Sequence, residues 1–143
     1  MIMITFIYVG DKYDRTRELV ATNIFNIMSG MIELPSKIEI EFCTLSESIY
    51  GETLLDPRFK NRIRLHEALT AKEIISPLIH ELLHLNQTHT GKLLGRRDGS
   101  FIWNGKVYKP QQNLSVNDWS QLPWEIDVAE KEKQYLSAIL NKA

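Results

Sequence analysis

One segment of the sequence, residues 70–88, limits the possible folds more than any other. Its apolar residues recur at the spacing of a helix that buries one face: Ile74, Ile75, Leu78, Ile79, Leu82 and Leu83. Upstream, Thr70 and Glu73 have the spacing of a capping box, in which each side chain accepts a hydrogen bond from the other residue's backbone N–H. Two histidines, His80 and His84, interrupt the apolar pattern. The fold must therefore cover this helix and also provide partners for two imidazoles.

Pro77 conflicts with one helix that runs through the whole segment, because proline donates no hydrogen bond and crowds the residue four positions earlier. Two interpretations remain open. The helix kinks at Pro77, or Ser76 caps a new helix with Pro77 as its first residue. In both interpretations residues 80 to about 88 are helical.

The rest of the chain carries patterns that predict further strands and helices. The predicted elements are a strand over 1–9, a helix over 14–29, a strand over 37–44, a loop over 46–60, a strand over 61–66, the helix described above, a hairpin over 101–108 and a helix over 123–140. This order predicts an α+β fold. No linker or repeat divides the chain, so we expect a single domain over residues 1–143.

Composition and charge exclude some partners. The net charge of −1 gives no global field for nucleic acid or an anionic membrane, so neither is expected as a partner. The single cysteine, Cys43, cannot form an internal disulfide and fits a small buried side chain. The apolar N-terminus has no basic start and no cleavage site, and it is too short to span a bilayer. We therefore expect a cytosolic (cytoplasmic) protein.

The string His-Glu-Leu-Leu-His at residues 80–84 predicts a metal site. Histidines four apart on a helix project from the same side, so His80 and His84 can bind one ion. Glu81 projects about 100° away from His80, where it can hold a water molecule without binding the ion. Zn²⁺ lowers the pKa of such a water to roughly 7, and Glu81 would accept its proton as general base. The alternative is an ordinary core helix with a polar His-Glu pair.

Catalytic zinc sites usually have three protein ligands, so a third is needed. Glu125 is the best candidate, because a carboxylate between Trp124 and Ile126 needs a partner. Small Ala129, one turn later, would let this helix approach the histidine helix closely. The alternative is a glutamate that only complements the dipole at the start of a helix.

Other residues are weaker candidates for the third ligand. His89 would lie on the opposite side of the helix from His80. Asp127 remains open as an acceptor of a hydrogen bond from a ligand histidine. The remaining alternatives are a strand histidine, two aspartates that fit local caps and one helical glutamate: His66, Asp98, Asp118 and Glu130.

Three segments together resemble the small zincin-like metallopeptidases, many of which are encoded by phages and bacteria: residues 80–84, the hairpin at 103–108 and Leu-Pro-Trp-Glu-Ile-Asp-Val-Ala at 122–129. The resemblance covers residues 62–135 and implies a hydrolase with a small mixed sheet packed on the active-site helix. It implies that His80, His84 and Glu125 bind Zn²⁺ and that Glu81 is the catalytic base. It also implies a peptide or protein substrate beside the strand around residues 63–65.

Two points of the resemblance stay open. Tyr108 and Tyr135 are the candidates for stabilising the oxyanion. The rival interpretation removes catalysis: a zinc-stabilised or vestigial-site interaction protein or virion-associated protein, in which His89 or Asp127 could complete a closed site with four protein ligands. Retention of Glu81 argues against that interpretation, because a structural site has no use for an unligated carboxylate.

Overall fold

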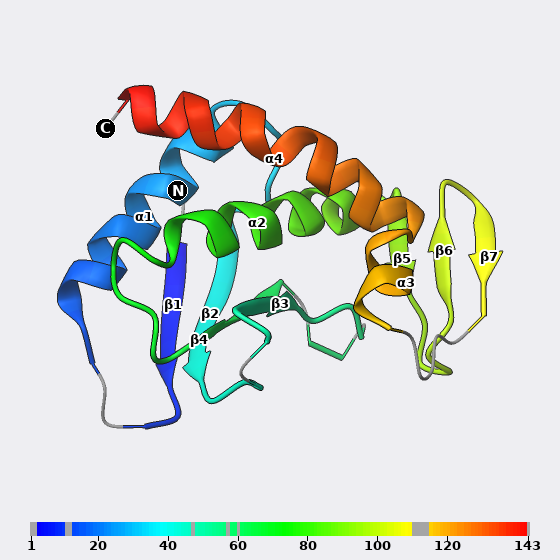
Figure 1. The fold of residues 1–143 in the computed structure, drawn as a ribbon, viewed down its shortest axis with the longest axis horizontal. Helices are drawn as coiled ribbons and strands as arrows, with labels where there is room; N and C mark the ends of the chain where they lie inside the picture. The colour runs from blue at the N-terminus through cyan, green and yellow to red at the C-terminus, as the bar shows by residue number, and fades with distance from the viewer. Residues whose placement is uncertain are drawn as a thin grey trace.

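The computed structural model describes residues 3–10, 13–46, 48–56, 58–59, 61–109 and 115–142. Met1 and Ile2, which belong to the first predicted strand, lie outside this range. The described chain is α+β, as predicted (Figure 1). Its elements are β1 (Met3–Tyr8), α1 (Arg15–Ser29), β2 (Lys37–Cys43), β3 (Gly51–Thr53), β4 (Arg62–His66), α2 (Ile75–His89), β5 (Leu93–Gly95), β6 (Phe101–Trp103), β7 (Lys106–Tyr108), α3 (Val116–Ser120) and α4 (Pro123–Lys142).

The main sheet has four strands in the order β1-β2-β4-β3. β1, β2 and β4 are parallel, whereas β3 runs antiparallel to β4. Parallel neighbours need a crossover, and α1 provides the one between β1 and β2. β3 lies within the segment that was predicted to be a loop. It has only three residues, too few to show a periodic pattern, and it forms one edge of the sheet.

The helices lie on one face of this sheet. Ile38 and Ile40 of β2 and Ile63 of β4 point toward them and are almost fully buried. Figure 1 shows α2 above the sheet and α4 above α2, with α1 beside them. One core joins all these layers, and its members in the helices include Phe25 and Met28 of α1, Leu78 and Leu82 of α2, and Val128 and Ile139 of α4. Burial of this large apolar set is what fixes α4 against α2.

The other face of the sheet carries alternating charges, which we call the charged ladder. It consists of Glu39, Glu41, Glu52, Arg62 and Arg64. Across β2 and β4, Glu39 lies opposite Arg62 and Glu41 opposite Arg64. The distances are 3.2 Å from Arg62 to Glu39, 2.8 Å from Arg64 to Glu41 and 3.4 Å from Arg64 to Glu52. Cross-strand pairs of opposite charge stabilise a sheet, so this face needs no covering helix.

The start of α2 resolves the conflict at Pro77. The backbone N–H of Thr70 donates to the Glu73 carboxylate, and the N–H of Glu73 donates to the Thr70 hydroxyl, as predicted. These bonds close turns before the helix, which begins at Ile75. Pro77 is therefore the third helical residue, within the first turn, where a backbone N–H has no helical acceptor to lose. Neither predicted arrangement is correct in detail, but residues 80–88 are helical.

A second sheet, β5-β6-β7, supports the start of α4. Its hairpin turn is the predicted one: Asn104 and Gly105 both have positive φ, 49° and 84°. Phe101, Trp103 and Tyr108 surround Trp124, with ring centroids 5.2, 6.5 and 5.4 Å from it. Trp103 therefore packs against a small second core formed by Leu93, Leu122 and Trp124.

Two short elements, β5 and α3, were not predicted. Among the described residues, no helix is both long enough and apolar enough to cross a membrane.

Candidate metal centre

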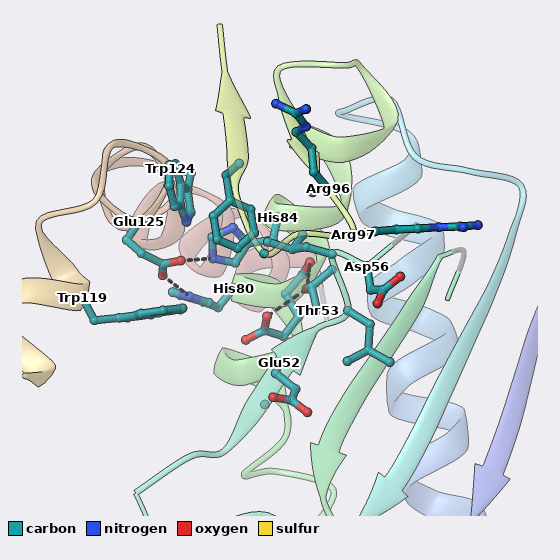
Figure 2. A pocket seen from close by; sticks show the side chains of 17 residues that line it. Glu52, Thr53, Asp56, His80, His84, Arg96, Arg97, Trp119, Trp124 and Glu125 are labelled. Carbon is teal, nitrogen blue, oxygen red and sulfur yellow. Dashed lines mark hydrogen bonds and ion pairs between the residues drawn. The ribbon is translucent and has the colours of Figure 1, made fainter. Parts of the chain in front are cut away.

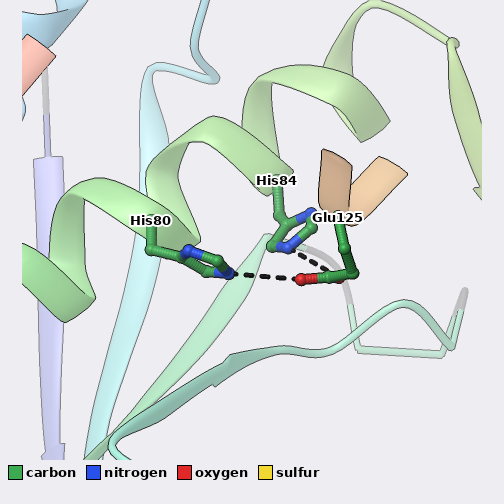
Figure 3. A group of neighbouring side chains, drawn as sticks. All are labelled: His80, His84 and Glu125. Carbon is green, nitrogen blue, oxygen red and sulfur yellow. Dashed lines mark ion pairs between the residues drawn. The ribbon is translucent and has the colours of Figure 1, made fainter. Parts of the chain in front are cut away.

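Three side chains from two helices converge at one point (Figure 3). His80 and His84 lie one turn apart on α2, and Glu125 lies in the first turn of α4. His80 Nε2 is 3.3 Å from Glu125 Oε1, and His84 Nε2 is 2.9 Å from Glu125 Oε2. Each of the three offers a ligand atom, and these atoms all lie within 4.8 Å of one another. The structure therefore brings together the three residues predicted to bind metal.

The spacing of these atoms suits a small metal ion. Metal bonds of about 2.1 Å in a tetrahedral site place neighbouring ligand atoms about 3.4 Å apart. The observed nitrogen–oxygen separations of 3.3 and 2.9 Å lie close to that value. Two imidazoles and one carboxylate form a donor set that several divalent metals accept. An ion could therefore enter between these groups with small movements of the side chains.

His80 is held from behind by a residue that sequence reasoning missed. Its Nδ1 is 3.2 Å from Glu132 Oε2, and the Ser76 hydroxyl donates to Glu132 Oε1 at 3.1 Å. A carboxylate only accepts hydrogen bonds, so Nδ1 carries the proton and Nε2 is left for a metal. Glu132 lies seven residues after Glu125, two turns along the same face of α4. That spacing was the available signal.

His84 has a different partner. Its Nδ1 is 2.8 Å from Gln87 Oε1, and the Gln87 amide nitrogen donates to Asp127 Oδ2 at 2.8 Å. The predicted direct bond from a ligand histidine to Asp127 is therefore replaced by a contact through Gln87. The amide reaches both groups because it lies between α2 and α4, which local sequence patterns do not show.

Glu81 lies next to this group without joining it. Thr53 of β3 donates a 2.9 Å hydrogen bond to Glu81 Oε1 and also contacts the Glu81 carbonyl oxygen at 3.0 Å. The carboxyl group is buried, and burial raises its pKa. A base with a raised pKa accepts a proton more readily near neutral pH. β3 thus fixes the position of Glu81.

The three converging groups perturb one another's pKa values. Burial alone would lower the pKa of His80, but its hydrogen bonds with Glu125 and Glu132 and the charge of Glu81 outweigh burial and raise that pKa to about 9. The pKa of His84 is also raised: burial alone would lower it, but the hydrogen bond with Glu125 and the charge of Glu125 outweigh burial. Burial alone would raise the pKa of Glu125, but hydrogen bonds from both histidines lower it to about 2. The histidines thus act as the counter-charges of a carboxylate that stays ionised.

A cavity of about 390 Å³ opens beside the two histidines (Figure 2). Its walls come from β3, α2, the small sheet, α3 and the start of α4. Trp119 lies next to His80, whereas Arg96 and Arg97 lie on the far side. A second hollow, lined by Ile49, Tyr50 and Pro77 among others, meets the first one at His80, Glu81 and Glu125. The converging groups therefore lie at the middle of a continuous cleft.

The cleft corrects one prediction. Its border is β3, not the strand around residues 63–65, because Ile63 and Leu65 are fully buried under the helices. Ala129 is exposed and lines the second hollow, while its neighbour Val128 is fully buried in the core.

The other candidate residues lie elsewhere. His89 is exposed, away from the converging histidines, and His66 accepts a hydrogen bond from the Ala68 N–H. Asp98 accepts the Ser100 N–H in a local turn, and Asp118 accepts the Ser115 N–H in the capping box of α3, so both cap local structure as expected. Glu130 is exposed.

The predicted oxyanion partners do not reach the cleft. Tyr108 packs on Trp124, and Tyr135 packs against the main core.

No protein-family model matches the chain, and neither a curated protein nor a solved structure shows significant similarity to it.

Proposed function

We propose that this protein is a zincin-like, zinc-dependent metallopeptidase. The observation that carries the proposal is the arrangement around α2. His80, His84 and Glu125 present their ligand atoms to one point, while the Glu81 carboxylate lies in the same cleft outside that group. Three ligands plus a separate carboxylate are the parts of a catalytic zinc site. A purely structural site would have a fourth protein ligand, and none of the described residues joins the group.

The chain's own residues divide the work as follows. Zinc held by His80, His84 and Glu125 would lower the pKa of a water and polarise the peptide carbonyl. Glu81 accepts the proton of the attacking water and then passes it to the leaving amine. Thr53 keeps the Glu81 carboxylate aimed into the cleft through its hydrogen bond. Burial favours this proton transfer, because it raises the pKa of Glu81 toward the pKa values of the groups with which Glu81 exchanges the proton.

The cleft suits an extended chain. β3 is an edge strand, so a peptide can add beside it and form backbone hydrogen bonds. Such a peptide would pass the convergence point between the two hollows. Exposed Trp119 and Tyr50 offer apolar surface on either side of the path. These features support a peptide or protein substrate.

The zinc-stabilised form of the non-catalytic alternative would have a closed site, with His89 or Asp127 as the candidates for a fourth ligand. His89 is exposed and outside the group, and Asp127 is engaged by Gln87 and Lys131. The geometry therefore favours the open, catalytic form of the site.

The test compares the parent protein with Glu81→Gln on a peptide library, with cleavage read by mass spectrometry. We expect the parent to cleave and the variant to be slower by roughly 10²- to 10⁴-fold, because the amide cannot accept the proton. Zinc content should stay the same in both. The matched control is Glu39→Gln, a carboxylate of the charged ladder that pairs with Arg62 and does not line the cleft. Equal cleavage by Glu81→Gln and the parent would contradict the proposal.

A further inference from the structure

Gln87 is a buried polar residue whose role the general features of a zinc site do not explain. Its side chain is 1% exposed, and it lies on α2 one turn after His84. It makes three contacts: its Oε1 with His84 Nδ1 at 2.8 Å, and its Nε2 with Trp124 O at 3.0 Å and Asp127 Oδ2 at 2.8 Å. All the polar atoms of this amide are therefore engaged.

These partners fix which way the amide points. The Trp124 carbonyl and the Asp127 carboxylate only accept hydrogen bonds, so they require the NH₂ end of Gln87. A flipped amide would place its oxygen against both acceptors and lose both bonds. The oxygen must therefore face His84. Asp127 is itself fixed by Lys131, whose Nζ lies 3.0 Å from Asp127 Oδ1.

The amide orientation in turn fixes the proton on His84. Because Gln87 presents an oxygen, Nδ1 of His84 must be the donor and carries the hydrogen. In the neutral ring the lone pair is then on Nε2, the atom that faces Glu125. His80 is set the same way by Glu132. The difference is that the partner of His84 is neutral and buried, whereas Glu132 is charged and partly exposed.

We infer that Gln87 is a positioning residue for metal binding. Its hydrogen bonds to α4 fix the orientation of its amide, and the amide in turn sets the tautomer and the ring orientation of His84. The inference rests on the proposed zinc site. The Gln87 oxygen accepts the hydrogen bond of His84 Nδ1 and so orients the imidazole. The NH₂ group of Gln87 donates to Trp124 and Asp127, and these bonds hold the amide in place. Trp124 directly precedes Glu125, so the same amide also braces α2 against the part of α4 that carries the third ligand. A neutral amide suits this position, because a carboxylate at position 87 would repel the Asp127 carboxylate.

The test measures Zn²⁺ affinity by competition with a chromophoric chelator in three variants. Gln87→Met keeps the volume but removes the acceptor, so we expect affinity to fall roughly 10- to 100-fold. Gln87→Glu keeps an oxygen that can accept the hydrogen bond of His84, but it loses the hydrogen bonds to Trp124 and Asp127 of α4. We expect it to bind zinc within a few-fold of the parent, with a lower melting temperature of the metal-free protein. Asn86→Leu is the control, because its amide also braces α2, but to Glu33 O away from the histidines. Its zinc affinity should match the parent.

A purely structural brace would give the opposite pattern. Gln87→Glu would then lose at least as much affinity as Gln87→Met, and that result would overturn the inference. Zinc affinity in Gln87→Met equal to that of the parent would overturn it as well.

If a variant does not fold, the parent itself gives the answer. Long-range ¹H–¹⁵N spectra of the zinc-loaded protein should show His84 protonated on Nδ1 and metallated on Nε2. The reverse assignment would contradict the inference. A parent protein that binds no zinc would instead refute the proposed function, which keeps the two failures distinct.

Discussion

The charged ladder and the metal centre are both clusters of charged side chains, but their charges are balanced in different ways. In the ladder, three carboxylates alternate with two guanidinium groups that are always charged. In the metal centre, Glu125 and Glu132 have ion pairs only with histidines among the described residues, and ionised Glu81 would add a third negative charge. Each carboxylate of the ladder has a permanently charged partner. The metal centre is complete only when its histidines are protonated or a cation replaces those protons.

A structural cluster of charged side chains can be distinguished from a functional one by how its charges are paired. Paired opposite charges that follow the strand register explain themselves by cross-strand pairing. Buried carboxylates that rely on weakly basic imidazoles leave a need for positive charge. The shifts of the His80 pKa to about 9 and of the Glu125 pKa to about 2 express that need.

The largest effect should come from adding or removing zinc. At a free zinc concentration about 1,000 times Kd, binding to the folded state alone adds about 4 kcal/mol to the free energy of unfolding. We expect a chelator to remove this increment, as measured by thermal melting. Glu39→Gln in the ladder should keep the full increment. A ladder variant that lost the zinc increment would break the distinction between the clusters.

Glu41→Gln should damage the ladder and leave the metal centre intact. Glu41 is buried and contacts both Arg62 and Arg64. Its loss leaves two partly buried guanidinium groups with weaker partners, at a cost of about 1–3 kcal/mol in denaturant unfolding. Zinc affinity should not change. Glu125→Gln should show the reverse: weak zinc binding, with a smaller loss in the free energy of unfolding than Glu41→Gln causes.

The metal-free protein should lose stability as pH rises from about 6.5 to about 9. The pKa of His80 is raised in the folded state, so its contribution is full below the unfolded value of about 6.5 and is lost as pH passes about 9. We expect a loss of about 1–3 kcal/mol over this window. The zinc-loaded protein should behave oppositely, because zinc displaces the protons. Urea unfolding at several pH values measures both, and His80→Gln should flatten the metal-free curve.

The smallest effect should come from the exposed end of the ladder. Glu39 pairs with Arg62 at 3.2 Å, but its side chain is 37% exposed. Exposed pairs contribute about 0–1 kcal/mol, so Glu39→Gln should change unfolding free energy by no more than that. A loss as large as that of Glu41→Gln would show that the ladder acts as one cooperative unit.

The sequence predicted those parts of the site that depend on local spacing. His80, Glu81 and His84 share one helix, so their relative directions follow from helical geometry alone. Glu125 was placed correctly because a carboxylate beside buried Trp124 needs a partner. The fold class, the hairpin turn and the approximate bounds of α1 and α4 also follow from short-range patterns.

The sequence could not show the features that depend on contacts between distant elements. β3 has three residues, and its role comes from pairing with β4 and bonding Glu81 through Thr53. No local sequence pattern marks Gln87, yet its amide joins α2 to α4. Such contacts become visible only when the helices are packed.

The most direct test of the account is the metal content of the natively purified protein, measured by elemental mass spectrometry beside Glu125→Ala and Glu41→Gln. The account predicts about one zinc per chain in the parent and in Glu41→Gln, and almost none in Glu125→Ala. Absence of zinc from the parent, even after zinc is supplied, would contradict it. Full zinc occupancy in Glu125→Ala would also contradict it, because the third ligand would then be another residue.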